Sequence, residues 1–160
     1  MEVLFYDPYL ADGVDKAIGV TRVESLEEIL STSDAISLHC PLSEETHHLI
    51  DQAAVGQMKA GAYLVNTARG AIVDSVAALA GISSGKLSGV ALDVLETEPP
   101  DEQSPLIQAW RDPEHAAHDR LIINPHAAFY SEQGLADMRI KGSENCLRAI
   151  LGQAPRNIIN

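Results

Sequence analysis

Short apolar runs, each too short for a helix and each ended by polar residues, recur along this chain of 160 residues. The clearest run extends from Ala62 to Val65 and leads directly into Asn66-Thr67-Ala68-Arg69-Gly70. A run of this kind is typical of a strand that is buried on both faces of a parallel sheet, with helices connecting successive strands. We therefore predict an α/β fold in which a parallel sheet is covered on both faces.

The same pattern predicts where the other strands and helices lie. Strands are expected at residues 2–6, 34–40, 62–66, 89–93 and 121–123, and helices at about 12–18, 25–30, 51–59, 74–84 and 131–151. Ser25, Asp51 and Asp74 stand where three of these helices need an N-cap. Residues 101–119 are polar and acidic, and we interpret them as a flexible insert with Trp110 pointing inward.

Composition argues against several classes of function. The net charge is -12 and the isoelectric point is about 4.7, whereas a nucleic-acid surface would need a basic face. No apolar run is long enough to span a bilayer, and the first residues do not resemble a signal peptide. Cys40 and Cys146 are far apart and form no C-x-x-C motif, which favours a reducing, cytoplasmic setting without a cysteine-bound metal. We expect a cytoplasmic protein whose partners are small molecules, and neither nucleic acid nor a membrane.

Polar residues gather where the predicted strands end. Asp7, His39, Asn66 to Arg69, Asp93 and His126 each follow an apolar run. The carboxyl ends of parallel strands share one edge of an open α/β sheet, and ligands bind at that edge, so these segments are expected to line one crevice. The planar guanidinium of Arg69 suits a carboxylate ligand, although a lone arginine after a strand is more often a surface residue.

A histidine and a glutamate near this edge could carry acid–base chemistry. His126 could exchange a proton near neutral pH, and Glu98 could hold its tautomer and stabilise its protonated form. Taken singly, His126 fits a structural loop histidine as well as it fits a catalyst. Glu98, which precedes two prolines, is more often a solvated loop residue.

Other polar residues near the predicted edge are open to interpretation. Asp7 is either a turn aspartate or a carboxylate that binds ribose hydroxyls. His47 and His48 are interpreted as exposed, because the pair lacks the spacing and the acidic neighbours of a metal site. Cys40 is interpreted as a small residue that lines the crevice without acting as a nucleophile.

Taken together, five parts of the sequence resemble the D-isomer-specific 2-hydroxyacid dehydrogenases, and most of all the C-terminal-binding-protein branch of that family. They cover nearly the whole chain in the family's order, and they are Phe5-Tyr6-Asp7-Pro8-Tyr9, Leu38-His39-Cys40 with His47-His48-Leu49-Ile50, Leu64-Val65-Asn66-Thr67-Ala68-Arg69-Gly70, Ala91-Leu92-Asp93-Val94 with Glu98-Pro99, and Pro125-His126-Ala127-Ala128-Phe129-Tyr130-Ser131-Glu132-Gln133. The resemblance implies a Rossmann-like doubly wound parallel sheet. It also implies hydride transfer between NAD(H) and a 2-hydroxy or 2-keto acid.

The resemblance implies roles for single residues as well. Arg69 would bind the substrate carboxylate and polarise the carbonyl, His126 would be the general acid in keto-acid reduction, and Glu98 would keep His126 protonated. Asp7 would bind the adenosine ribose and favour NAD, because its negative charge would repel a 2′-phosphate. The other implied cofactor-binding residues are Cys40, Thr46, Thr67, Ala68 and Asp93, together with Arg69 and His126.

The sequence departs from the family's pattern in two places. It contains no G-x-G-x-x-G loop with a strand before it, so we expect a fragment that begins at the second strand of the nucleotide-binding domain. Two inner strand edges would then be unpaired, which costs stability and invites association. Phe129 stands where the animal branch has a tryptophan, so the substrate preference of that branch does not carry over.

Our leading hypothesis is an NAD-dependent 2-hydroxyacid dehydrogenase. Residues 1–152 would be a partial NAD-binding domain, and residues 153–160 would be a tail that returns toward a substrate domain. The alternatives are an NAD-responsive, corepressor-like binding protein and an inactive truncated remnant. The family also implies a homodimer formed through the nucleotide-binding domain.

Overall fold

The computed structural model describes residues 1–158, and the chain divides into two units, Met1–Pro125 and His126–Asn160. The elements of the first unit are β1 (Leu4–Phe5), α1 (Val14–Ile18), β2 (Thr21–Arg22), α2 (Leu26–Thr32), β3 (Ala35–Leu38), α3 (Gln52–Gln57), β4 (Ala62–Asn66), η1 (Gly70–Ile72), α4 (Ser75–Ser83), β5 (Leu87–Leu92), α5 (Pro105–Arg111), η2 (His118–Arg120) and β6 (Leu121–Ile123). The second unit contains α6 (Glu132–Ile150).

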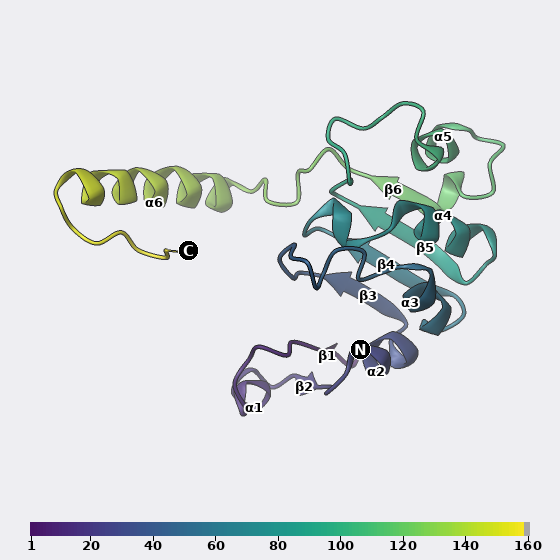
Figure 1. Ribbon diagram of the computed structural model, residues 1–160, viewed down its shortest axis with the longest axis horizontal. Coiled ribbons are helices and arrows are strands. Elements are labelled where there is room, and N and C mark those ends of the chain that lie inside the picture. The colour runs from purple at the N-terminus through teal and green to yellow at the C-terminus, as the bar shows by residue number, and fades with distance from the viewer. Residues whose placement is uncertain (159–160) are drawn as a thin grey trace. The chain divides into compact units, whose positions relative to one another are not determined.

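A four-stranded parallel sheet forms the centre of the first unit. Its strands lie side by side in chain order, β3-β4-β5-β6 (Figure 1). Leu64 of β4 lies opposite Ile36 of β3 and Val90 of β5, so the three strands run in register. The parallel α/β architecture predicted from the apolar runs is therefore confirmed, and the bounds of β4 and β6 are as predicted.

The predicted N-caps hold the helices that connect these strands. The Ser25 side chain accepts a hydrogen bond from the backbone N–H of Glu28, and Asp51 accepts one from Ala54. Asp74 begins α4 by accepting from two backbone N–H groups of the first turn. Each cap satisfies donors that the helix itself cannot, which is why these short helices begin where they do.

Within the first unit, one face of the four-stranded sheet packs against the helices, and no helix of that unit covers the other face. Leu64 and Leu87 are fully buried, whereas Tyr63 and Ile122 point to the opposite face and are 54% and 61% exposed. Right-handed crossovers between strands that follow one another in chain order place every connecting helix on the same side. Helices α3, α4 and α5, which make these connections, accordingly contact one another in a row, and α2 contacts α3. Within the first unit, the expectation that helices cover both faces is met for one face.

The first two strands form a separate sheet. β1 and β2 pair in parallel, with Leu4 opposite Thr21 and Phe5 opposite Arg22. In the doubly wound order, one further strand stands between the strands that correspond to β1 and β3. The described residues divide into two sheets at that position, so β1 and β3 each pair on one side only. The sequence pattern did not predict β2.

The interpretation of residues 101–119 as a flexible insert is wrong. Pro105 opens helix α5, and proline suits the first turn because its missing N–H has no partner there. Leu106 and Ala109 are buried in the hydrophobic core, and Trp110 packs against that core while partly exposed. The segment is thus anchored to the core by apolar side chains on one face of a helix within an acidic stretch.

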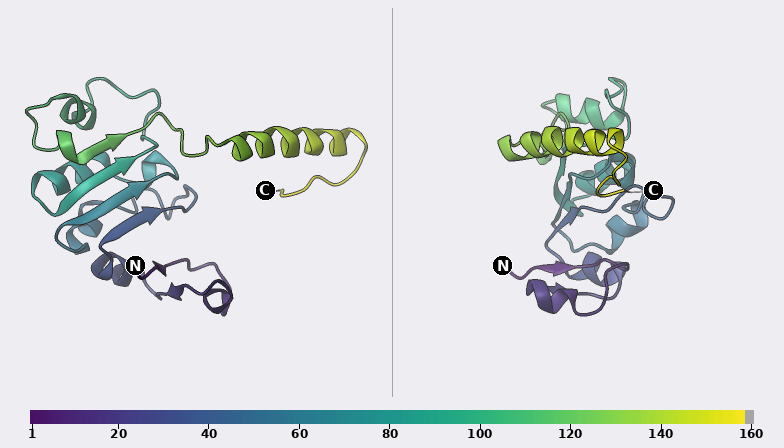
Figure 2. Two further views of the ribbon diagram at one scale, coloured as in Figure 1. Left: turned by 180° about the vertical axis from the view of Figure 1, so that it is seen from behind. Right: turned by 90° about the vertical axis from the view of Figure 1, so that its left-hand side faces the viewer.

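The second unit is built around a single long helix. Figures 1 and 2 show α6 as one uninterrupted helix. The Ser131 hydroxyl caps it by accepting from the N–H of Gly134 at 2.9 Å, and Gly152 follows its end at a φ of 69°, as predicted for a helix over 131–151. The described part of the chain contains no helix with the length and apolar character needed to cross a membrane.

Candidate active site at the ends of β4 and β5

The turn that carries Arg69 is closed by the side chain of Asn66. Asn66 ends β4 and is completely buried. Its Nδ2 donates to the backbone carbonyl of Arg69 at 2.8 Å, and its Oδ1 accepts from the N–H of Ala68 at 3.0 Å. Both ends of one amide therefore fix the backbone between the strand and the arginine.

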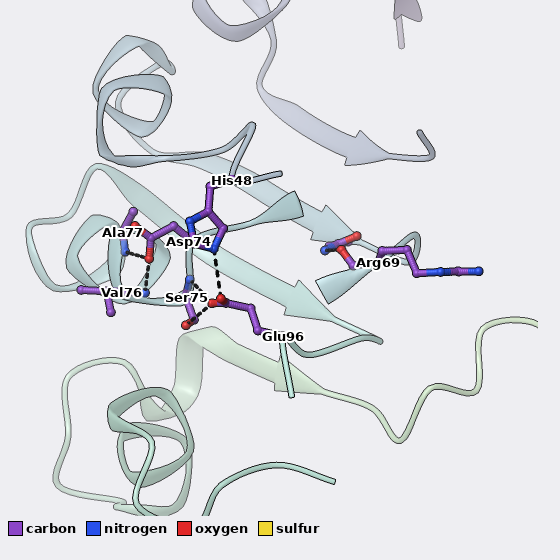
Figure 3. Close-up of polar contacts among 8 residues, drawn as sticks. His48, Arg69, Asp74, Ser75, Val76, Ala77 and Glu96 are labelled. Atoms are coloured by element: carbon purple, nitrogen blue, oxygen red, sulfur yellow. Dashed lines mark hydrogen bonds and ion pairs between the residues drawn. The ribbon is translucent and has the colours of Figure 1, made fainter. Parts of the chain in front are cut away.

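The side chain of Arg69 extends from this turn into solvent. Its NH1 donates to the carbonyl of Ala68 at 2.7 Å, and the residue is exposed. Figure 3 shows the guanidinium pointing away from the polar cluster at the start of α4. The arrangement presents a fixed positive charge at the carboxyl end of β4, where an anionic ligand could reach it.

The loop after β5 passes directly over Gly70. A Cβ atom at position 70 would lie 1.9 Å from the carbonyl carbon of Leu95 and 2.4 Å from the backbone nitrogen of Glu96. The N–H of Leu95 in turn donates to Oε1 of Glu98 at 2.8 Å. Arg69 and Glu98, predicted from separate segments, therefore belong to two stretches of backbone that touch.

Asp93 joins the same end of the sheet. It follows β5 directly, is 5% exposed, and its backbone N–H donates to the carbonyl of Asn66 at 2.9 Å. The structure thus brings Asn66, Arg69, Asp93 and Glu98 to the carboxyl ends of two neighbouring strands.

A second polar cluster lies beside this turn, at the start of α4. Oε1 of Glu96 accepts from the N–H of Ser75 at 3.0 Å and from its hydroxyl at 2.6 Å, and Oε2 lies 3.0 Å from Nε2 of His48 (Figure 3). Partial burial opposes ionisation of Glu96, but the hydrogen bonds from Ser75 and His48 outweigh it and lower the pKa of the carboxyl group. His47 is exposed as predicted, whereas His48 is half-buried and its ring contacts the carboxylate of Glu96.

Asp7 and Cys40 lie near each other at the ends of β1 and β3. Burial raises the pKa of the Cys40 thiol, and the nearby negative charge of Asp7 adds to this effect. Oδ1 of Asp7 accepts from the N–H of Tyr9 at 2.9 Å. A thiol that stays protonated fits the prediction that Cys40 lines the crevice without acting as a nucleophile.

The remaining predicted residues occupy less constrained positions. The hydroxyl of Thr46 donates to the carbonyl of Pro41 at 2.6 Å and closes the loop after β3. Thr67 is exposed in the turn before Arg69. His126 opens the second unit with a φ of 53°, and its ring meets that of Phe129 edge to face at 6.2 Å.

Asn66 is expected to be important for stability. Replacing Asn66 with alanine leaves the carbonyl of Arg69 and the N–H of Ala68, which are partly buried, without this partner, and this should cost about 2–3 kcal/mol. Thermal unfolding followed by circular dichroism should show a loss of about 5–10 °C. Gln52→Ala, at the exposed start of α3, is the control and should melt like the unmodified protein. Equal melting of both variants would contradict the role given to Asn66.

Glu96 is expected to make stability depend on pH in acid. Because its pKa is lower in the folded state than in the unfolded chain, its contribution is complete above about pH 5 and is lost as the pH falls through the folded pKa. Urea unfolding of the unmodified chain and of Glu96→Gln, at several pH values between about 7 and 3, measures this contribution. The difference in unfolding free energy should be largest at neutral pH and should shrink in acid. A constant difference would show that the charge of Glu96 does not matter.

Several of these groups escaped prediction from the sequence. Asn66 was noted only as part of a polar stretch, although a small amide that ends a buried strand is a signal for a side chain that closes a turn. The sequence predicts a role for Glu98 but none for Glu96, which lies two residues before it. Ser75 carried no signal, because its contact depends on the path of a distant loop.

The chain is similar to a described protein family and to several known proteins. A family model described as "D-isomer specific 2-hydroxyacid dehydrogenase, NAD binding domain" matches residues 1–128. The D-lactate dehydrogenase of Treponema pallidum (strain Nichols) is 41% identical over 156 residues, which are 95% of this chain and 46% of that protein. C-terminal-binding protein 1 of Caenorhabditis elegans is 33% identical over 160 residues, which are 99% of this chain and 21% of that protein.

The crystal structure of a D-lactate dehydrogenase from Treponema pallidum is similar to this chain, with a TM-score of 0.83 and 39% sequence identity. The match covers 99% of this chain and 48% of that one. The chain therefore spans less than half the length of each of these relatives.

Proposed function

The chain belongs to the D-isomer-specific 2-hydroxyacid dehydrogenases, whose NAD-binding domain it matches, and from this premise we propose that it serves NAD-dependent reduction of 2-keto acids to 2-hydroxy acids. The reverse reaction would oxidise the CH–OH group of the 2-hydroxy acid. The similarity to D-lactate dehydrogenase over nearly the whole chain supports this reading.

The observation that carries the proposal is the contact between the Arg69 turn and the loop that leads to Glu98. A 2-keto acid has a carboxylate next to a carbonyl group, so its site needs a cation for the one and a proton donor for the other. Arg69 would bind the carboxylate and polarise the carbonyl. His126 would donate the proton to the carbonyl oxygen, and Glu98 would favour the protonated imidazole.

The groups at the strand ends fit NAD by their chemistry. The carboxylate of Asp7 is an acceptor for ribose hydroxyl donors, and its charge disfavours a 2′-phosphate. The nicotinamide half would lie against the backbone of Thr67 and Ala68, near the buried Asp93 and beside Cys40 and Thr46. When bound, NAD supplies or accepts the hydride. The chain's own residues would orient the acid and carry the proton.

We further propose the wider organisation of the protein. Residues 1–152 act as part of the NAD-binding domain, and residues 153–160, of which 159 and 160 lie outside the described residues, lead toward a substrate domain. The partner molecules are small 2-keto or 2-hydroxy acids, and a second copy of the chain forms a homodimer. An acidic net charge of -12 gives no support to direct nucleic-acid binding, and two free cysteines fit a cytoplasmic setting.

The direct test uses a hybrid enzyme, in which this chain replaces the matching 156 residues of the Treponema pallidum D-lactate dehydrogenase. We expect the hybrid enzyme to bind NADH more tightly than NADPH, as measured by cofactor fluorescence. It should also oxidise NADH when supplied with one of a set of 2-keto acids that begins with pyruvate. The 160-residue chain, titrated beside it, shows how much of the cofactor affinity it carries alone. A hybrid that binds NADH but reduces no 2-keto acid would contradict the proposal.

That last outcome would favour a second candidate, an NAD-responsive binding protein. The similarity to C-terminal-binding protein 1 over 99% of this chain is the observation behind it. Such a protein would bind NADH and change its association with other proteins without turning over a 2-keto acid. Size-exclusion chromatography with and without NADH would then detect the change in association.

A further inference from the structure

Glu96 connects three segments that are far apart in the sequence, yet the proposed reaction gives it no role. Its carboxylate accepts from the N–H and the hydroxyl of Ser75, at the first residue of α4, and contacts His48 in the loop after β3. Side-chain exposures of 33% for Glu96 and 36% for His48 show that the pair is partly shielded from solvent. A carboxylate with three such partners holds its own backbone in one place.

Two carboxylates from different segments accept hydrogen bonds from the N–H groups at the start of α4, which supports an anchoring role for Glu96. Oδ1 of Asp74 already accepts from the N–H groups of Val76 and Ala77, as the ordinary cap of α4 (Figure 3). Glu96, which comes from a different segment, takes the N–H of Ser75 and adds its hydroxyl. Since Asp74 caps the helix, what Glu96 adds is a connection between α4 and the loop after β5.

The side chain of Glu96 holds the backbone of Leu95 and Glu96, and this backbone lies directly against Gly70. The nitrogen of Glu96 and the carbonyl of Leu95 occupy the space that a side chain at Gly70 would need. A shift of this loop away from α4 would remove one of two restraints on the turn that carries Arg69, the other being the side-chain amide of Asn66. The position of Arg69 therefore depends in part on the anchoring of a loop from another strand.

The same loop segment also orients Glu98. The N–H of Leu95 donates to Oε1 of Glu98 at 2.8 Å, so the carboxylate of Glu98 is tied to the residue directly before Glu96. The four residues 95–98 thus contact the turn of Arg69 and also include Glu98, whose carboxylate they orient.

We propose that Glu96 is a positioning residue, which holds the loop after β5 against α4 and His48 and thereby keeps Arg69 and Glu98 in place. This inference rests on the proposed function for the meaning of Arg69 and Glu98, but the anchoring itself can be tested without turnover. Glu96 acts through its neighbours and need not touch substrate or cofactor.

The first experiment measures amide hydrogen exchange by NMR in the 160-residue chain. In Glu96→Ala, the N–H groups of Ser75 and Leu95 should exchange at least about tenfold faster, because both lose the contacts that the anchored loop provides. Glu96→Gln keeps an acceptor oxygen and should give a smaller increase. Glu102→Ala removes an exposed glutamate that pairs with Arg111, and it should leave both amides unchanged.

The second experiment measures kinetics in the hybrid enzyme. Because Glu96→Ala loosens the Arg69 turn, the KM for the 2-keto acid should rise about tenfold or more and kcat should fall, whereas the Kd for NADH should stay within about twofold. A variant that merely unfolds in part would lose NADH binding and 2-keto acid turnover together. Glu96→Gln should recover part of the loss, and Glu102→Ala should behave like the unmodified hybrid.

The two experiments separate the failure of this inference from the failure of the proposed function. Unchanged exchange at Leu95 and Ser75 in Glu96→Ala would overturn the anchoring. Faster exchange with unaltered KM for the 2-keto acid would overturn the positioning role. If the unmodified hybrid reduces no 2-keto acid, the proposed function fails, and the exchange data alone then decide whether Glu96 holds the loop.

Discussion

Replacing Arg69 with lysine in the hybrid enzyme is expected to lower kcat/KM for the 2-keto acid by about 10²- to 10³-fold, a loss typical of removing one aligned donor from an active site. Lysine keeps the charge, but it loses the planar pair of N–H groups that can bind a carboxylate at two points. The Kd for NADH, measured by fluorescence, should change little. Steady-state assays with varied 2-keto acid give the kinetic constant.

Arg111→Lys is the matched control for this substitution. Arg111 is an exposed arginine at the end of α5 that pairs with Glu102, outside the Arg69 turn. It should leave both kcat/KM and the Kd for NADH unchanged. If Arg69→Lys were as active as Arg111→Lys, the substrate carboxylate would have to bind elsewhere.

Replacing Gly70 with alanine is expected to be the most destabilising single methyl addition in this unit. The new Cβ would meet backbone atoms of Leu95 and Glu96 at 1.9–2.4 Å, and backbone atoms cannot move aside as the end of a side chain can. We expect a loss of about 3–5 kcal/mol, since the loop must separate from the Arg69 turn. Thermal unfolding followed by circular dichroism should show a decrease of about 10 °C or more.

Gly56→Ala provides the opposite case in the same chain. Gly56 lies in α3, and a Cβ placed there has no neighbour within 4 Å apart from its chain neighbours and the backbone of its own helix. Alanine is the better helix former by about 1 kcal/mol, so this variant should melt slightly higher than the unmodified protein. If Gly70→Ala melted within about 2 °C of the unmodified chain, the close approach of the loop would be wrong.

Much of the fold could be predicted because local signals agreed with the global arrangement. The strand at 62–66 is a short run of mainly apolar residues that ends at the polar Asn66, and the long helix begins at a serine and ends before a glycine. β2 could not be predicted, because a two-residue strand has no periodicity to detect. Helix α5 was not predicted, because its apolar residues lie within a stretch whose overall composition is acidic and polar.

The candidate site was predictable to the extent that it follows from strand ends. The rule that parallel strands deliver polar groups to one edge grouped Asn66 to Arg69 with Asp93, and the structure confirms that these segments touch. The partners of Glu96 could not be found in this way, because Ser75 and His48 come from a helix start and a loop. Contacts between loops depend on where each loop runs in space, and sequence spacing does not record that path.

The order of the strands in the main sheet has a consequence for how the protein is made. Each of β4, β5 and β6 pairs with the strand that precedes it in the chain, and no pairing within β3-β4-β5-β6 waits for a later segment. During synthesis the chain emerges from its N-terminal end, so every new strand finds its partner already present. The turn of Arg69 can close as soon as β4 has formed, because Asn66 and Ala68 are its immediate neighbours. The contact with Leu95 and Glu96 follows only when the ribosome has delivered β5 and the loop after it, so this part of the site needs two strands and their loops.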